Sequence, residues 1–398
     1  MKIIDFYINL NQGHELSYRF TFNEDVNIFT GANGSGKTTV LKTLWYCISG
    51  NIHRIIQDSH INHIELRTEE YLLLIINDDA TYFISYYELD STLKSVSHLQ
   101  ADIEFVINLQ KDPTYIRTNI HSLNQKLSQA FGSSLYFPTY RRIEGGYMLS
   151  RDRSEETSIT SNINSRHDLL RSQFDSLYGN DSGKLHNALS DHSNTLSRGN
   201  HKFITTVSIY DIVELIAETQ FDEMRRNFSN DAQLGHEVRE IISDYITNDS
   251  IRHINKLDEN SIINHIKDLL ITINPTYTDS QRSSLDILRD SIIELGYTEK
   301  INVEDLNSYN TSLTNLSSGE KQILSFLCYN AHYKNSTIFI DEPELSLHVD
   351  WQRNLVRHLS NQKTNNQLFL TTHSPFIYTQ HENKEHILEK CEVTKHAK

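Results

Sequence analysis

One octapeptide near the amino terminus limits the folds open to this chain more than any other feature. Only 14 of the 398 residues are glycine, yet three of them lie within residues 31–38. This segment matches the pattern GxxxxGK[ST] at every fixed position. A short β-branched and aromatic run precedes it at 26–30, and apolar residues recur at helical spacing over 39–45. The order strand, glycine-rich loop, helix predicts an α/β fold with a phosphate-binding loop.

The residue types of this loop suit the phosphates of a nucleotide. Glycines allow backbone N–H groups to turn toward an anion, and the amino terminus of the next helix favours negative charge. We expect Lys37 to reach the β- and γ-phosphates and the Thr38 hydroxyl to ligate Mg²⁺. The sequence therefore predicts ATP and Mg²⁺ as cofactors, bound by Gly31, Asn33, Gly34, Ser35, Gly36, Lys37, Thr38 and Thr39.

A second motif, near the carboxyl terminus, ends in two acids. The apolar and β-branched run at 337–340 is typical of a parallel strand that is buried on both faces. Because open α/β sheets bind ligands at the carboxyl ends of their strands, we expect Asp341 beside Mg²⁺. Glu342 is then placed to act as the general base that polarises the attacking water. A helix cap or a solvated strand end is the alternative for such an acid pair.

The chain also resembles a known family between and after these motifs. Residues 316–322 read LSSGEKQ and open a helical pattern, which resembles the signature motif of the ABC ATPases. By that resemblance, Ser317, Ser318 and Gly319 present a helix amino terminus to the γ-phosphate of ATP held by another subunit. An ordinary helix cap is the alternative interpretation of these serines.

A histidine completes the resemblance. Residues 367–375 are typical of a strand that ends in His373, which resembles the family's switch histidine and is then expected to contact the γ-phosphate and the attacking water. Residues 344–348 resemble the loop that communicates across two active sites. The motifs also follow in the family's order. The resemblance implies an α/β P-loop NTPase of the ABC ATPase head type.

Spacing indicates the branch of the family and the domain organisation. Lys37 and Ser317 lie 280 positions apart, more than a compact transporter subunit needs. The gap begins with an antiparallel β lobe and a helix at about 113–131. Four helical patterns over 207–295 then predict an inserted helical lobe, which either contacts another subunit or a partner protein or only forms its own core. The lobe's predicted strands are 61–68, 71–77, 81–88 and 102–109. We predict an amino-terminal part of the head at 1–145, a polar loop and helical insertion at 146–305, and a carboxyl-terminal part of the head at 306–398.

The segment 137–144 is similar to one in stand-alone ABC-type ATPases of bacterial anti-phage systems, and this group shares the block at 341–348. The group includes the Septu, PARIS and retron-associated ATPases, with OLD-type ATPases as more distant relatives. By this resemblance, the chain is a sensor or regulatory scaffold that controls a separately encoded effector, expected to be a nuclease. It also implies a homodimer with ATP between its heads, or a larger homo-oligomer.

One part of the family pattern is missing. The glutamine that helps to hold the cation is not evident, and Thr139 or Arg141 occupies its place. Two interpretations of Arg141 and Arg142 stay open: they hold a phosphate of nucleotide, partner or nucleic acid, or they form a solvated surface pair.

Charge and composition limit the kinds of partner that the chain can bind. The formal net charge is -15, and residues 151–300 contribute -9 of it, so nucleic acid is expected only at the head. No CxxC spacing and no apolar run of about 18 residues occur, which predicts a cytoplasmic protein without a membrane partner. No nuclease motif is apparent, so we do not expect the chain to cut nucleic acid itself. The first rival function is a RecF-like DNA-repair ATPase that clamps DNA in its ATP state, and the second is a transporter-associated ATPase.

Overall fold

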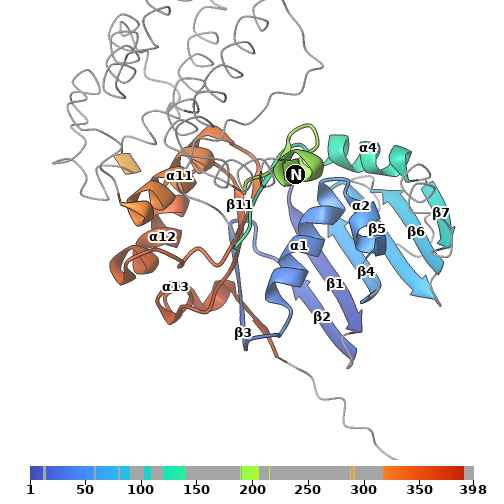
Figure 1. Ribbon diagram of the computed structural model, residues 1–398, viewed down its shortest axis with the longest axis horizontal. Coiled ribbons are helices and arrows are strands. Elements are labelled where there is room, and N and C mark those ends of the chain that lie inside the picture. Colours follow the sequence, from blue (N-terminus) through green and yellow to red (C-terminus); the bar gives the residue numbers. More distant parts are fainter. Residues whose placement is uncertain are drawn as a thin grey trace, which may run out of the picture.

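Two six-stranded sheets organise the computed structural model (Figure 1). The structure describes residues 1–11, 15–57, 60–78, 81–89, 103–108, 120–139, 189, 191–205, 215, 287, 290–291 and 317–389. The predicted helical patterns of 207–295 and the arginines at 141 and 142 therefore lie outside the described residues, apart from a few isolated positions. None of the helices described is long and apolar enough to cross a membrane.

The first sheet is antiparallel and has the strand order β2-β1-β4-β5-β6-β7. Its strands are β1 (Ile3–Asn11), β2 (Glu15–Thr21), β4 (Ile61–Thr68), β5 (Tyr71–Asp78), β6 (Thr81–Glu88) and β7 (Ile103–Asn108). Alternate residues along β6 are buried, because one face of the sheet covers the core and the other faces solvent. The predicted antiparallel β lobe is confirmed, with β4 and β6 at the expected bounds.

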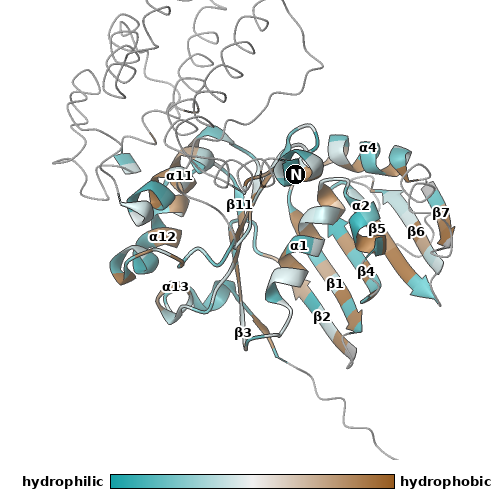
Figure 2. Cartoon of the chain, viewed as in Figure 1, coloured by the Kyte–Doolittle hydropathy of each residue, from teal (hydrophilic) through white to brown (hydrophobic). Residues whose placement is uncertain are grey.

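The second sheet is parallel throughout and has the order β12-β3-β11-β10-β8-β9. Its strands are β3 (Val26–Gly31), β8 (Ser134–Phe137), β9 (His201–Phe203), β10 (Thr337–Asp341), β11 (Gln367–Thr371) and β12 (Glu385–Leu388). Every residue of β10 is buried, as expected for a strand covered on both faces. Figure 2 shows apolar residues along the strands of both sheets.

One strand differs from the predicted domain bounds. β9 lies within residues 146–305, which we expect to be an insertion, yet it pairs in parallel with β8 as part of the head's own sheet. Its three residues are too few to show a strand period in the sequence. The buried His201 links it to the sheet, because its Nδ1 lies 2.7 Å from Ser134 Oγ.

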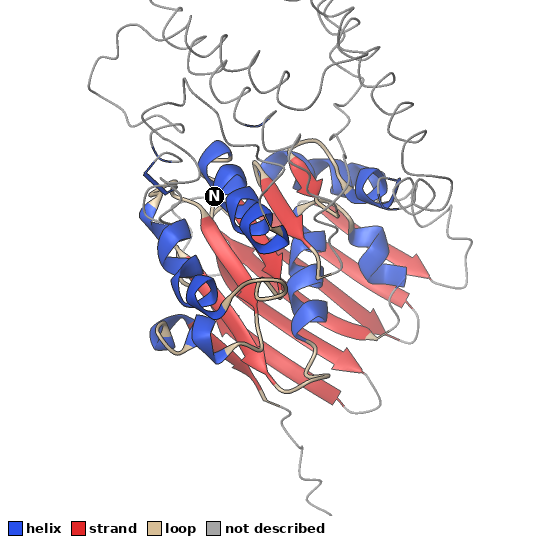
Figure 3. Ribbon diagram, turned by 60° about the vertical axis from the view of Figure 1, so that its left-hand side comes forward, coloured by secondary structure: helices blue, strands red, loops and turns tan. Residues whose placement is uncertain are grey.

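Helices fill the space between the two sheets and cover the outer face of the parallel sheet (Figures 1 and 3). The inner helices are α1 (Lys37–Ile48), α2 (Ile52–Gln57) and α4 (His121–Ala130). The outer helices are α11 (Ser318–His332), α12 (Val349–Asn361) and the short α13 (Pro375–Tyr378), which is followed by the 3₁₀ turn η6 (Glu382–Lys384). α4 begins at His121, eight positions after the predicted start; residues 113–119 lie outside the described part.

Side chains of the parallel sheet alternate between two cores. Tyr136, Phe339 and Phe369 point to the side of α1 and the antiparallel sheet, while their chain neighbours point toward α11 and α12. The ring centroids of Phe339 and Phe369 are 5.0 Å apart and nearly parallel, and Tyr136 stacks on Phe203 at 5.1 Å. This row of aromatic rings packs along β9, β8, β10 and β11. The parallel pairing of these strands places their carboxyl ends at one edge.

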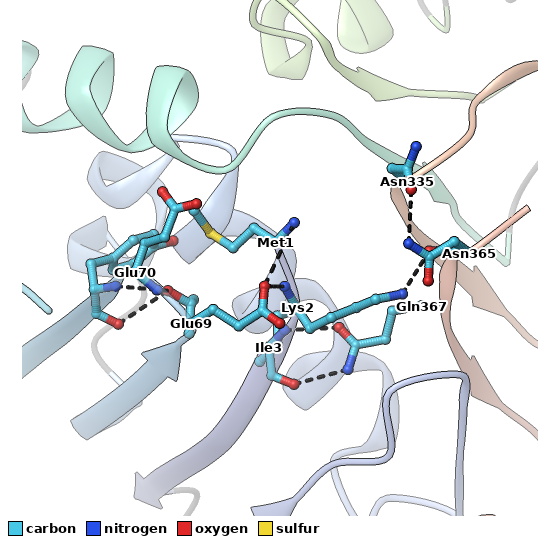
Figure 4. A network of polar contacts seen from close by, with 10 residues as sticks. Met1, Lys2, Ile3, Glu69, Glu70, Asn335, Asn365 and Gln367 are labelled. Carbon is cyan, nitrogen blue, oxygen red and sulfur yellow. Dashed lines mark hydrogen bonds and ion pairs between the residues drawn. The ribbon is translucent and has the colours of Figure 1, made fainter. Parts of the chain in front are cut away.

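A buried amide joins the two sheets at the opposite end of β11. The Gln367 side chain accepts a hydrogen bond from the Ile3 amide at 2.8 Å and donates one to the Ile3 carbonyl at 2.8 Å (Figure 4). Lys2 extends the contact by donating to the Asn365 carbonyl at 2.6 Å, and its own amide donates to Glu69 at 2.9 Å. The antiparallel sheet is thus tied to the strand that ends at the candidate site.

Candidate nucleotide-binding site

The loop at residues 31–38 joins β3 to α1 and ends in an open helix terminus. Gly36 is the N-cap of α1 and has φ 90°, a left-handed conformation that glycine adopts without steric cost. No side chain caps this helix and its first turn has no acidic residue. The amide groups of the first turn and the positive end of the helix dipole therefore form a site suited to an anion.

Lys37 lies across the same loop. Its Nζ donates to the carbonyl oxygens of Gly31 at 3.0 Å and Ala32 at 3.1 Å. Burial lowers the pKa of Lys37, while the carboxylates of Glu342 and Asp341 oppose that shift. An ammonium group held beside exposed amides adds a point charge to the anion site.

Asp341, at the end of β10, bonds to residues at the ends of two neighbouring strands, β8 and β11. Its carboxylate is 1% exposed and accepts a hydrogen bond from Thr38 Oγ1 at 3.0 Å. Thr139, which follows β8, donates to the other oxygen at 2.5 Å, and Thr371 at the end of β11 donates to the first. The structure thus brings Thr38 and Asp341 together across 303 residues of chain. It also places Thr139 there.

Glu342 takes a backbone conformation unusual for a residue with a side chain. Its φ is 48°, and its amide donates to both the carbonyl oxygen and the hydroxyl of Thr371, each at 3.1 Å. Burial raises the pKa of Glu342, with further contributions from Asp341 and Glu344, whereas His373 and Lys37 lower it. A carboxylate of raised pKa accepts a proton more readily than an ordinary glutamate.

His373 follows β11 and is exposed, and it lies near enough to Glu342 to lower the pKa of that carboxyl. The His373 amide donates to Glu344 Oε1 at 2.7 Å, which joins the histidine segment to the loop after β10. The predicted residues Lys37, Thr38, Asp341, Glu342 and His373 therefore gather at the carboxyl edge of the parallel sheet, the edge at which open α/β sheets bind ligands.

The signature segment at 317–319 begins α11. Ser317 and Glu320 form a capping box: Glu320 N–H donates to Ser317 Oγ at 3.3 Å, and Ser317 N–H donates to the Glu320 carboxylate at 2.7 Å. The helix-cap alternative therefore holds for Ser317, while Ser318 is exposed at the first position of the helix. Between the signature serines and the 31–38 loop, no hydrogen bond occurs in the described part of the chain.

The loop at 343–348 lies between the signature segment and the segment that contains His373. A Cβ atom on Gly319 would come within 2.4 Å of the Ser346 carbonyl oxygen, so only glycine permits this approach. Gln322 Nε2 donates to the Pro343 carbonyl at 2.9 Å. On the other side, Gln352 Nε2 donates to the Leu347 carbonyl at 2.9 Å and its Oε1 accepts from Ser374 Oγ at 2.6 Å. The loop thus contacts α11, α12 and the histidine segment at once.

Sequence reasoning missed Thr371 and Gln352 as parts of the site. Thr371 precedes the Thr-His pair in a strand-ending motif, which is a signal for its position but not for its partners. Gln352 lies in an amphipathic helix whose pattern shows no functional residue. Among the residues described, no group of three His, Cys, Asp or Glu side chains could hold a metal ion by itself. The oxygen atoms that meet at this point come from Thr38 and Asp341.

The chain is similar in sequence to several curated proteins. A curated relative named "Retron Vc95 probable ATPase", from Vibrio cholerae serotype O1 biovar El Tor, is 22% identical over 396 aligned residues; the match spans 91% of this chain and 68% of the relative. "Retron Ec83 probable ATPase" from Escherichia coli is 33% identical over 88 residues, which is 19% of this chain and 16% of that protein. The DNA replication and repair protein RecF of Ruminiclostridium cellulolyticum is 34% identical over 83 residues, 20% of this chain and 22% of RecF.

Solved structures of SMC head domains also match. The head from Pyrococcus furiosus, crystallised with the C-terminal domain of ScpA, gives a TM-score of 0.34 at 12% identity and covers 95% of this chain and 91% of that chain. The SMC head from Thermotoga maritima gives 0.31 at 12% identity, over the same shares.

A protein-family model matches most of the chain. It matches residues 26–378, which contain the 31–38 loop, the signature segment, the acid pair and the histidine. The expected kinship with retron-associated ATPases is confirmed by this match and by the two retron relatives. The chain therefore belongs to the family described as "AAA domain, putative AbiEii toxin, Type IV TA system".

Proposed function

We propose that the chain binds ATP with Mg²⁺ at the 31–38 loop and hydrolyses it to ADP and phosphate. One observation carries the proposal: the Thr38 hydroxyl lies 3.0 Å from the buried carboxylate of Asp341, directly beside an open helix terminus and Lys37. The family and the retron relatives support an ATPase of this type.

The residues at this point suit a magnesium nucleotide. Oxygen atoms of a hydroxyl and a carboxylate are the donors that Mg²⁺ prefers, and phosphate oxygens supply others. When bound, Mg²⁺ neutralises charge on the β- and γ-phosphates. Thr38 and Asp341 would hold it. We further propose that Thr139 takes the place of the missing glutamine, because its hydroxyl already donates to Asp341.

Glu342 is the proposed general base. Its raised pKa and its place one residue after Asp341 suit a carboxylate that removes a proton from the attacking water. Lys37 would balance the phosphate charge, and His373 would orient the γ-phosphate and the water from the other side. The link from Glu344 to the His373 amide supports this arrangement.

A second copy of the chain would complete the site. Ser318 is exposed, and Gly319 places the α11 terminus against the loop at 343–348. We propose that Ser317, Ser318 and Gly319 meet the γ-phosphate bound by the partner head, so that ATP closes a homodimer and hydrolysis reopens it. Larger homo-oligomers are compatible with the same contact.

The biological role that we propose is that of a regulatory scaffold in an anti-phage complex, acting in the cytoplasm and controlling a separate effector, expected to be a nuclease. The relative from Vibrio cholerae supports it, because that retron protein aligns with 91% of this chain. Co-expression with the genes beside it, followed by phage challenge, tests the role. Protection that survives Lys37→Ala would argue against an ATP-dependent scaffold.

Two variants test the enzymatic proposal. Lys37→Ala should lose most ATP binding, because it removes the only charge contributed by the loop itself. Glu342→Gln should bind ATP, hydrolyse it at least about 100-fold more slowly and accumulate a closed dimer. Glu382→Gln, an exposed change in η6, is the matched control and should keep wild-type turnover. Wild-type turnover in Glu342→Gln would remove its role as base.

A DNA-repair ATPase that clamps DNA is the second candidate, favoured by the RecF match over 83 residues. If it applies, Glu342→Gln saturated with ATP should bind duplex DNA with an affinity that falls steeply with salt, since phosphate contacts release counterions. Equal, weak binding with and without ATP would exclude a clamp.

A further inference from the structure

Thr371 is a buried residue whose single hydroxyl contacts the carboxylate of Asp341 and the backbone amide of Glu342. This residue is the last of β11 and is 0% exposed. Its Oγ1 donates to Asp341 Oδ1 and accepts from the Glu342 amide at 3.1 Å. β10 and β11 are parallel, with Asp341 and Thr371 paired directly. The hydroxyl therefore links the side chain of Asp341 to the backbone of Glu342.

We propose that Thr371 is a positioning residue for the proposed hydrolysis of ATP, on which this inference rests. Its hydroxyl fixes the carboxylate of Asp341 and the backbone of Glu342 relative to each other, so that the cation ligand and the base keep a constant separation. Asp341 is also held by Thr38 and Thr139, but neither of these hydroxyls bonds to Glu342.

The backbone of Glu342 explains why such a support is needed. A left-handed φ of 48° costs a residue with a side chain free energy that surrounding contacts must offset. The Glu342 amide donates to both the carbonyl and the hydroxyl of Thr371. Without the hydroxyl, the amide loses one of these two bonds and the backbone of Glu342 gains freedom to rotate. The catalytic carboxylate would then spend less time in its productive orientation.

Thr371→Val removes the hydroxyl and keeps the branched shape. We expect kcat to fall by about 10- to 100-fold, the loss typical of one hydrogen bond to a charged group in a preorganised site. The KM for ATP in the presence of Mg²⁺ should rise by no more than several-fold, because the hydroxyl acts on the proposed cation ligand Asp341 and not on the phosphates directly. Thr371→Ser retains the hydroxyl and should recover most of the lost kcat.

Thr337→Val is the matched control. Thr337 is the first residue of β10, is equally buried, and its hydroxyl has no hydrogen-bond partner among the residues described. The change therefore removes the same group from the same sheet, at the end away from the site. It should leave kcat unchanged, and the thermal midpoints of the two valine variants show whether each variant is folded.

A second readout uses no turnover. Binding of a fluorescent ATP analogue should be unchanged in Thr371→Val when EDTA is present, whereas the gain in affinity on adding Mg²⁺ should shrink by several-fold. If wild-type enzyme hydrolyses ATP and Thr371→Val matches Thr337→Val in kcat and in this gain, the inference is overturned while the proposed function stands. If the wild type neither hydrolyses ATP nor loses binding in Lys37→Ala, the proposed function fails, and the inference with it.

Discussion

The close contact between Gly319 and the loop at 343–348 predicts how Gly319→Ala changes the stability of the protein. A steric clash lowers the stability, and the higher helix propensity of alanine raises it. A methyl group at position 319 would lie 2.4 Å from the Ser346 carbonyl oxygen and 3.0 Å from a ring carbon of Trp351. The first neighbour is backbone, so it cannot rotate away as a flexible side chain can. Overpacking of this kind costs about 1–3 kcal/mol.

Helix propensity acts in the other direction. Gly319 is in the first turn of α11, and alanine is favoured over glycine inside helices by about 1 kcal/mol. Because the clash exceeds this gain over most of its range, we expect Gly319→Ala to destabilise the protein by up to about 2 kcal/mol. If the loop yields instead, it moves away from α11, and the links from Glu344 to His373 and from Gln352 to Ser374 move with it. ATP turnover should then fall as well.

Urea unfolding followed by circular dichroism measures the shift in midpoint, and a phosphate-release assay measures turnover. Ser318→Ala is the stability control, because it changes the exposed neighbouring position of the same helix and adds no contact with the loop. Its midpoint should stay close to that of the wild type. A Gly319→Ala protein that is as stable as the wild type, or more stable, and turns over ATP normally would refute the close approach.

Two further predictions concern the dimer contact and pH. Ser318→Arg should abolish hydrolysis but retain ATP binding at the 31–38 loop, as measured by turnover and nucleotide titration, and unaffected turnover would reject its contact with the partner head's ATP. Burial lowers the pKa of His201 to about 4 from 6.5. Because the unfolded chain binds this proton at higher pH than the folded one, stability is full above about pH 6.5 and should decrease by about 3 kcal/mol as pH falls toward 4. Thermal melts of His201→Gln should show a smaller decrease over that interval, and equal slopes would contradict the shift.

Much of the site could be predicted because its signals are local. The 31–38 loop needs glycines at set positions, the buried strand at 337–340 needs an unbroken apolar run, and both lie where the sequence indicates. Parallel pairing then brings the ends of β3, β10 and β11 to one edge, which general rules of α/β sheets predict. The antiparallel lobe could also be predicted, because its strand segments are separated by polar turns.

Some partners could not be predicted because they depend on register between distant strands. Nothing near Thr371 marks it as a partner of Asp341, and only the pairing of β10 with β11 places its hydroxyl on that carboxylate. Thr139 is a sequence candidate for the place of the missing glutamine, but its bond to Asp341 depends on the pairing of β8 with β10. β9 could not be predicted for a similar reason. Its three residues are too few to show a strand period, and its place in the sheet depends on the stacking of Phe203 on Tyr136.

The sequence by itself determined the chemistry of this protein: an anion-binding loop, a lysine, an acid pair and a histidine in the order of an ATPase head. The tertiary structure decided how these groups are held. It placed a hydroxyl between the two acids, brought a glycine against a carbonyl of the loop at 343–348, and joined the histidine segment to Glu344. Local composition can specify which groups a site contains, but the distances between them follow from packing and strand register, which many remote residues set together.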